Sequence, residues 1–169
     1  MLIFNTSRRR RPLVPSANDI STADELVITR VFSAPPALVF AAWTEPEHLA
    51  HWSGPKGFTT PHHEMDLRPG GRYRACLRSP EGEDNWVGGV YREIQPPVRL
   101  VMTHAWESAD GRPGPETLVT VTFAEEGPGR TRMHFRQTGF TSKVSRDGHE
   151  GGWSSSFDKL AAHLEGATE

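Results

Sequence analysis

His104 is the residue whose type and position most directly suggest chemistry. It belongs to an expected strand in which the alternate residues Met102, His104 and Trp106 carry large side chains and so share one face. Imidazole titrates near neutral pH, and one that projects into an apolar cavity could polarise a carbonyl group or move a proton, although desolvation would lower its pKa. His104 is therefore the candidate for acid–base catalysis or ligand recognition. The alternative is a core histidine that hydrogen-bonds to Tyr73, Gln137 or the backbone.

Four further histidines raise the question of a metal site. His48 and His51 are three residues apart on an expected helix, so they can share a face. His62 and His63 are neighbours in an expected strand, where adjacent side chains point to opposite faces, so at most one could join them. We interpret all four as histidines at a helix end and a strand start, and we expect no metal.

Other catalytic motifs and cofactor motifs are missing from the sequence. No phosphate-binding loop, dinucleotide glycine motif or HExxH zinc motif occurs, and we expect no cofactor. Ser154 and Ser155 follow Trp153 without the strand-turn-helix elbow that a nucleophilic serine requires. No second acid–base group is paired with His104 in the sequence. Whether the chain is an enzyme stays open, and the absence of a catalytic constellation favours a binding protein.

Composition indicates one folded domain with a basic leader. The chain has 169 residues, 36% of them apolar, and a net charge of -2. Residues 1–22 contain four arginines and no hydrophobic periodicity, which predicts a disordered basic tail, and residues 23–169 form the expected domain. The remainder is mildly acidic, which argues against nucleic-acid binding. The lone Cys76 and the lack of a long apolar segment favour a cytoplasmic protein that does not insert into membranes.

The expected order of elements is a strand, two short helices, six strands and a long helix. Pro35 and Pro36 suit the start of the first helix, and Thr44 with Glu47 has the spacing of a capping box for the second. Glycine and proline clusters separate the later strands by short turns, which predicts antiparallel hairpins. The expected strands are 26–32 and the segments near 62–68, 72–78, 85–94, 98–107, 116–124 and 130–138.

The long helix is predicted by an apolar run that opens near Glu150. Trp153, Phe157, Leu160 and Leu164 are spaced by four, three and four residues, so they form one stripe along a helix. A sheet that covers such a stripe tends to curl around it. We expect the curl to enclose an apolar cavity, although the same residues would also suit a filled core.

Six motifs in this order resemble the family related to the C-terminal domain of the heat-shock-protein-90 ATPase activator, which belongs to the START-like, or SRPBCC, helix-grip superfamily. They are residues 32–52 (FSAPPALVFAAWTEPEHLAHW), 54–55 (GP), 66–71 (DLRPGG), 89–94 (GVYREI), 97–103 (PVRLVMT) and 151–153 (GGW). The resemblance implies an α+β fold in which a seven-stranded antiparallel sheet, with two short helices after its first strand, curls around a long C-terminal helix. Members of the superfamily bind lipids, sterols, polyketides or aromatic metabolites, and a minority are cyclases or hydrolases. Chaperone activation is a property of the eukaryotic namesake, which has an additional N-terminal domain.

The resemblance also implies a set of ligand-binding residues. His104 stands where relatives often carry an aromatic residue, and Gln137 stands where a histidine is common, which suggests a ligand with its own polar requirement. The leading prediction is binding of a small hydrophobic or aromatic molecule. The alternatives are a cyclase- or hydrolase-type enzyme that uses His104 and a co-chaperone-like module; a homodimer is also left open. The expected ligand-binding residues are Trp52, Phe58, Met65, Tyr73, Leu77, Met102, His104, Trp106, Gln137, Trp153 and Phe157.

Overall fold

The elements of the computed structural model follow the predicted order, and the structure describes residues 24–167. The strands are β1 (Glu25–Phe32), β2 (Thr59–Met65), β3 (Arg72–Arg78), β4 (Asp84–Gln95), β5 (Arg99–Trp106), β6 (Thr117–Glu125) and β7 (Thr131–Thr138). The helices are α1 (Pro36–Thr44), α2 (Pro46–Trp52) and α3 (Lys143–Ala167). The predicted basic tail, residues 1–22, lies outside the described residues.

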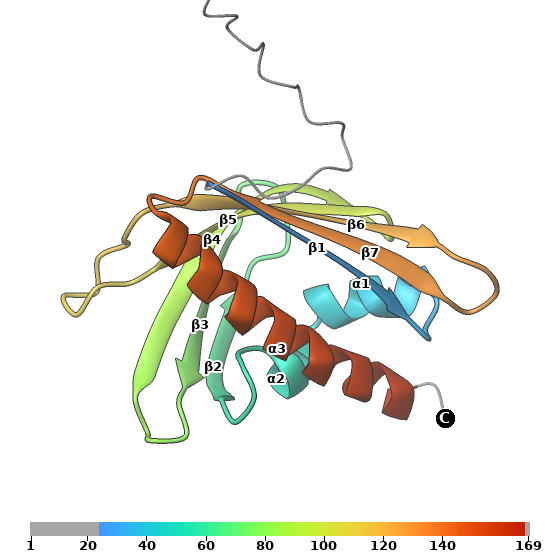
Figure 1. Ribbon diagram of the computed structural model, residues 1–169, viewed down its shortest axis with the longest axis horizontal. Helices are drawn as coiled ribbons and strands as arrows, with labels where there is room; N and C mark the ends of the chain where they lie inside the picture. The colour runs from blue at the N-terminus through green and yellow to red at the C-terminus, as the bar shows by residue number, and fades with distance from the viewer. Residues whose placement is uncertain (1–23, 168–169) are drawn as a thin grey trace, which may run out of the picture.

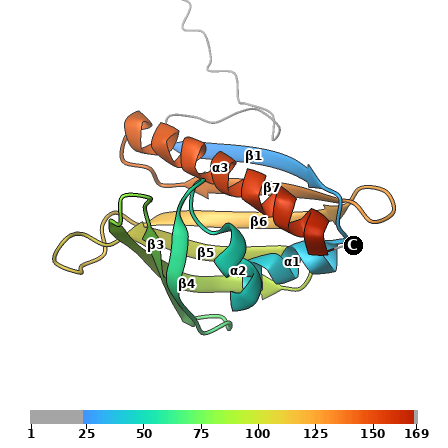
Figure 2. The same ribbon diagram turned by 90° about the horizontal axis from the view of Figure 1, so that it is seen from below.

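The seven strands form one antiparallel sheet in the order β1-β7-β6-β5-β4-β3-β2. The sheet is strongly curved, and α3 lies across its concave side together with α1 and α2 (Figures 1 and 2). A register shift between Tyr91 and Glu93 interrupts the β4–β5 pairing, and such bulges increase local bending. Gly89 permits close approach of β4 and β5, because a Cβ there would lie 2.0 Å from the carbonyl oxygen of Thr103.

The predicted apolar stripe of α3 faces the sheet. Phe157, Leu160 and Leu164 are almost completely buried, whereas Trp153 is half-buried. Each fully buried side chain of this size contributes about 2 kcal/mol to folding through the hydrophobic effect. The helix is therefore held to the sheet along its C-terminal half. Its N-terminal half contains Trp153 and overlies the site described below.

The predicted helix-grip architecture is confirmed, with two local corrections. Helix α3 begins at Lys143 rather than near Glu150, because the turns that contain Gly148 remain helical in spite of glycine's low propensity. Thr44 does not cap α2. It ends α1, where its hydroxyl donates to the Phe40 carbonyl oxygen (3.0 Å), and Glu45 is the N-cap, because Pro46 suits the first helical position.

No helix among residues 24–167 combines the length and the apolar character needed to cross a bilayer.

Candidate functional site

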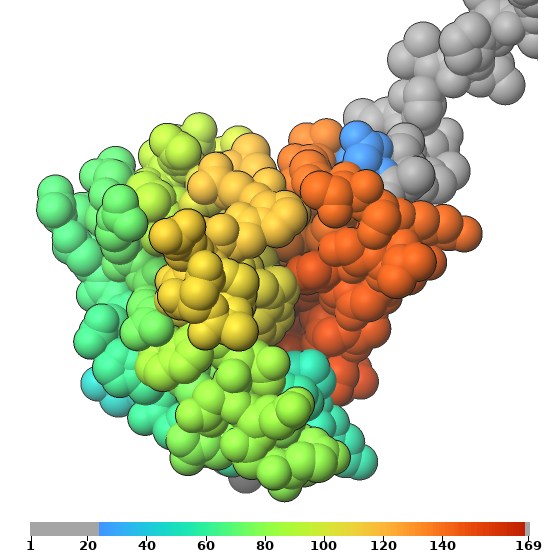
Figure 3. Space-filling view, turned by 90° about the vertical axis from the view of Figure 1, so that its left-hand side faces the viewer, coloured from blue at the N-terminus to red at the C-terminus, as the bar shows by residue number. Residues whose placement is uncertain are grey.

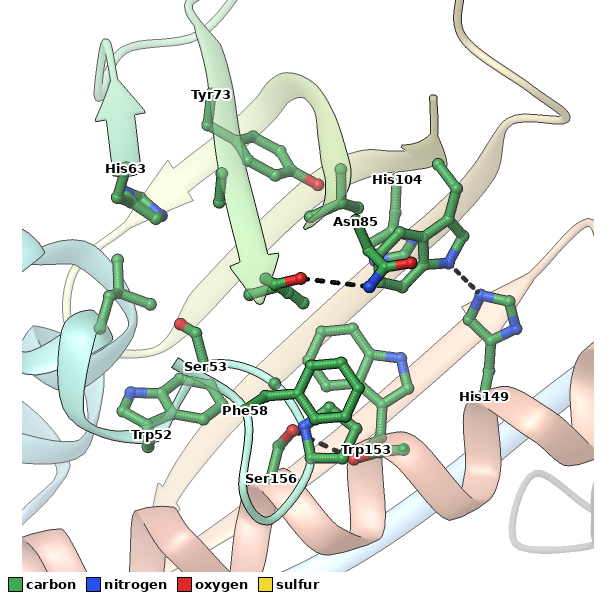
Figure 4. A pocket seen from close by; sticks show the side chains of 18 of the residues that line it. Trp52, Ser53, Phe58, His63, Tyr73, Asn85, His104, His149, Trp153 and Ser156 are labelled. Atoms are coloured by element: carbon green, nitrogen blue, oxygen red, sulfur yellow. Dashed lines mark hydrogen bonds between the residues drawn. The ribbon is translucent and has the colours of Figure 1, made fainter. Parts of the chain in front are cut away.

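A cavity of about 490 Å³ lies between the concave face of the sheet and the first half of α3. This volume is in the range of pockets that hold small organic ligands. In Figure 4, Trp153, Ser156 and His149 project from α3, Tyr73 and His104 from the sheet, and Trp52 lies on the α2 side. Most lining side chains are aromatic or aliphatic. Among the described residues that line it there is no aspartate, glutamate, lysine or arginine.

The cavity meets solvent near the start of α3. Val144 and Trp106 both line it, and they are 83% and 37% exposed. Figure 3 views this end of the molecule, where the orange segment that includes the start of α3 lies beside the yellow β5–β6 connection, and the green β3–β4 hairpin lies below that connection. The lining thus runs from exposed residues at this end to buried residues such as Met102 and Tyr91.

Eight of the eleven predicted ligand-binding residues line the cavity. The other three do not line it: Gln137 is fully buried and contacts His104 and Trp153, Phe157 packs against Trp153, and the partly buried Met65 packs against the core. The lining residues from the prediction are Trp52, Phe58, Tyr73, Leu77, Met102, His104, Trp106 and Trp153.

The sequence reasoning missed several lining residues. His149 precedes Trp153 by one helical turn, so continuing the apolar stripe backwards by four residues would have found it. Val144 and Ser145 were missed because the helix was expected to begin later. His63 alternates with Met65 and Tyr91 precedes the β4–β5 bulge, but neither position carries a sequence signal for a cavity.

A directional hydrogen-bond network surrounds His104. Three neighbouring strands supply it, because β5 carries His104, β6 carries Thr117 and β7 carries Gln137. The indole Nε1 of Trp153 donates to Gln137 Oε1 at 2.8 Å, and Gln137 Nε2 donates to Thr117 Oγ1 at 2.8 Å. Gln137 Nε2 also lies 3.5 Å from His104 Nδ1, and the Thr117 hydroxyl donates to the His104 carbonyl oxygen at 2.9 Å. We call His104, Thr117, Gln137 and Trp153 the His104 network.

Burial keeps His104 neutral. Desolvation, together with a smaller effect of the nearby His149, lowers its pKa to about 3. The rings of Trp106, His149 and Trp153 lie with their centroids 5.6–5.8 Å from that of His104. Of the partners considered for a core histidine, Gln137 lies within hydrogen-bonding distance of His104 Nδ1, whereas the Tyr73 hydroxyl donates to the Thr103 carbonyl oxygen at 2.6 Å.

Both ring nitrogens of His149 are engaged in hydrogen bonds. The indole Nε1 of Trp106 donates to its Nε2 at 3.0 Å, so Nδ1 carries the proton and donates to the Ser145 carbonyl oxygen at 2.7 Å. These bonds link the end of β5 to the first turns of α3. They hold Trp106 beside His104 at the solvent end of the cavity.

Two other lining residues carry a buried ring nitrogen without a hydrogen-bond partner in the described part of the chain. They are Nε1 of Trp43 and Nδ1 of His63. Desolvation also lowers the pKa of His63, and His62 acts in the same direction. An unpaired buried polar group costs about 1–3 kcal/mol. Buried polar atoms in the cavity wall near α1 and β2 are thus less completely hydrogen-bonded than those around His104.

A lysine holds the loop between α2 and β2 against α3. Lys159 Nζ donates to the carbonyl oxygens of Ser53, Gly54, Pro55 and Phe58 at 3.0–3.4 Å, and desolvation lowers its pKa. The loop supplies four lining residues, including Phe58. We call Lys159 and its four carbonyl partners the Lys159 clamp.

The four histidines considered as metal ligands do not converge. His48 and His51 meet His163 of α3, with His48 Nδ1 2.8 Å from His163 Nε2 and the His51 and His163 rings stacked at 4.8 Å. His62 packs on Trp86, whereas His63 faces the cavity. Within residues 24–167 no group of three or more histidine, cysteine, aspartate or glutamate side chains is placed to hold a metal ion.

The chain was compared with protein families and with curated proteins. Residues 33–165 match the family model described as Activator of Hsp90 ATPase homolog 1-like protein. No curated protein matches the chain.

Solved structures of similar proteins cover nearly the whole described region. An AHSA1 protein from Silicibacter pomeroyi is 30% identical, with a TM-score of 0.76 over 83% of this chain and 97% of that one. A protein from Chromobacterium violaceum is also 30% identical, with a TM-score of 0.76 over 84% and 97% of the two chains. A protein from Arthrobacter aurescens is 27% identical, with a TM-score of 0.74 over 85% and 87%.

Proposed function

Since the chain belongs to the Activator of Hsp90 ATPase homolog 1-like protein family, whose START-like fold commonly binds hydrophobic ligands, we propose that it binds a small hydrophobic or aromatic molecule between the sheet and α3. The observation that carries the proposal is the cavity of about 490 Å³ with a mainly apolar lining. Transfer of an apolar ligand from water to such a surface is favourable by about 25 cal/mol per Å² buried. We place this activity in the cytoplasm.

The enzyme alternative has less support. His104 would need a second acid–base group, and no carboxylate or lysine occurs among the described lining residues. Both nitrogens of the neighbouring His149 are engaged in hydrogen bonds. No feature of the described surface favours a chaperone contact over ligand binding.

A cavity-filling substitution tests the proposal. Ala75 is buried and lines the cavity from β3, so Ala75→Phe should occupy ligand space. Arg72→Phe adds the same ring on the same strand at an exposed position and serves as the matched control. Quenching of tryptophan fluorescence by isopropenylnaphthalene should be saturable in the wild type and in Arg72→Phe. The dissociation constant of isopropenylnaphthalene should rise at least about tenfold in Ala75→Phe.

Equal affinity in Ala75→Phe and Arg72→Phe would contradict binding in the cavity. Thermal unfolding of both variants shows whether they remain folded. A variant that unfolds cooperatively and has lost only the quenching supports the proposed site.

A further inference from the structure

The orientation of Gln137 is set by Trp153. An indole N–H can only donate a hydrogen bond, so the Gln137 atom 2.8 Å from Trp153 Nε1 must be the amide oxygen. The amide nitrogen therefore faces Thr117 and His104. Thr117 fits this direction, because its hydroxyl proton is used on the His104 carbonyl oxygen and its Oγ1 is free to accept from Gln137.

This orientation in turn sets the tautomer of His104. Gln137 Nε2 is a donor, so the His104 Nδ1 atom that it faces must accept. A neutral imidazole carries one proton, which then resides on Nε2. Beyond the strand pairing, the hydrogen bonds of His104 to described residues use its carbonyl oxygen and Nδ1, which leaves Nε2–H without an acceptor among them. Of the two imidazoles in this part of the lining, His149 has no nitrogen left for a ligand, and His104 has one N–H donor.

The charge of the lining restricts the ligand further. A ligand with a full charge would lose hydration and meet no lysine, arginine, aspartate or glutamate among the described lining residues. The rings around His104 offer flat apolar surfaces instead, since Trp106 and Trp153 both contact it. The polar requirement of this wall is thus one hydrogen-bond acceptor on an otherwise apolar molecule.

We infer that the cavity takes an uncharged aromatic molecule that carries a carbonyl oxygen, and that His104 Nε2–H donates a hydrogen bond to this oxygen. The inference rests on the proposed function and adds the ligand's chemical class and the residue that selects it. His104 acts here as a specificity-determining residue, with Gln137 and Trp153 as the groups that position its proton.

Four probes of similar size separate these requirements: naphthyl methyl ketone, isopropenylnaphthalene, naphthoate and naphthylmethylammonium. Their dissociation constants are measured on the full-length protein near pH 7.5 by tryptophan fluorescence and calorimetry. The ketone should bind about three- to tenfold more tightly than the hydrocarbon, which matches the contribution of one neutral hydrogen bond. The carboxylate and the ammonium should bind at least about 100-fold more weakly than the ketone.

His104→Phe should abolish the preference for the ketone and leave hydrocarbon affinity within about twofold. His134→Phe makes the same change on β7 at a residue that does not line the cavity, so it is the control and should keep the preference. If His104→Phe fails to fold, nitrogen-15 NMR of the wild type reads the tautomer directly. The shifts of the two His104 nitrogens should show Nε2 protonated, and the Nε2 shift should change when the ketone binds.

The two proposals fail in distinguishable ways. Equal binding of ketone and hydrocarbon, or protonation of His104 at Nδ1, overturns the assignment of His104 as the donor and leaves the apolar site intact. Tighter binding of naphthoate or of the ammonium overturns the uncharged ligand class. Failure of both uncharged probes to bind contradicts the proposed function and this inference together.

Discussion

The His104 network and the Lys159 clamp border the same cavity, but they satisfy polar groups in different ways. In the network, side chains bond to side chains and every donor has one allowed direction, because Trp153 can only donate. In the clamp, one ammonium group donates to four backbone carbonyl oxygens, which are interchangeable partners at similar distances. The first arrangement specifies which atom faces a ligand, whereas the second specifies only where a loop lies. Recognition should therefore depend on the network, and access on the clamp.

The largest expected effect is a loss of stability when a residue of the His104 network is replaced. Gln137→Leu removes the acceptor of the Trp153 indole and the donor to His104, and it leaves both polar atoms in an apolar wall. The free energy of unfolding should fall by about 2–3 kcal/mol. Chemical denaturation measures this value. Arg136→Gln, the exposed neighbour on β7, is the control and should cost less than about 1 kcal/mol.

The next largest effect is expected at low pH. Acidification tests the His104 network separately from the Lys159 clamp, because it acts through the titration of His104. Unfolded His104 binds a proton near pH 6.5, whereas in the folded protein its pKa is about 3. Between these values the unfolded state binds more protons, so the free energy of unfolding falls as pH falls, by about 1.4 kcal/mol per unit for this group. From pH 7.5 to pH 5 the wild type should lose about 2 kcal/mol more than His104→Phe.

A parallel pH dependence in wild type and His104→Phe would show that His104 is not desolvated. Other histidines also contribute to the slope, since burial lowers the pKa of His163 and of His63. The difference between the two proteins isolates His104. Lys159→Met leaves every histidine in place, so its free energy of unfolding should show the same pH dependence as that of the wild type.

The smallest effect on stability is expected at the clamp. Lys159→Met keeps the aliphatic stem but removes the donor, and the carbonyl oxygens of the half-exposed loop can turn to water. The free energy of unfolding should fall by about 1 kcal/mol. Ligand exchange, followed by stopped-flow fluorescence with naphthyl methyl ketone, should become faster while the preference for the ketone is kept. If Lys159→Met lost the preference for the ketone over the hydrocarbon, recognition would depend on the clamp as well as on the network.

The sequence predicted the fold more completely than the site. Alternation in the strands, glycine and proline turns and the spacing from Trp153 to Leu164 are local signals, and the structure confirms the architecture that they indicate. The start of α3 was misplaced because glycine propensity gives no sign that Gly148 lies inside the helix. Eight of the residues that the family resemblance implied line the cavity. For Met102, His104 and Trp106, alternation along the strand also indicates a common face. Their role in ligand binding remains a proposal.

The network itself could not be read from spacing. His104, Thr117 and Gln137 lie on three strands whose register is fixed only by folding, with His104 opposite Thr117 and Gln137 opposite Val119. The tautomer of His104 depends on a contact between Trp153 and Gln137 that crosses from helix to sheet. The Lys159 clamp depends on a loop about 100 residues away. Tertiary contacts of this kind leave no periodic trace in the sequence.

The most direct test of an occupied cavity is an NMR measurement of intermolecular proton contacts with bound naphthyl methyl ketone. The account predicts nuclear Overhauser effects from the naphthyl protons to the methyl groups of Met102 and Leu77, which line the cavity on β5 and β3. Contacts confined to exposed residues on the outer face of the sheet, such as Leu118, would contradict it.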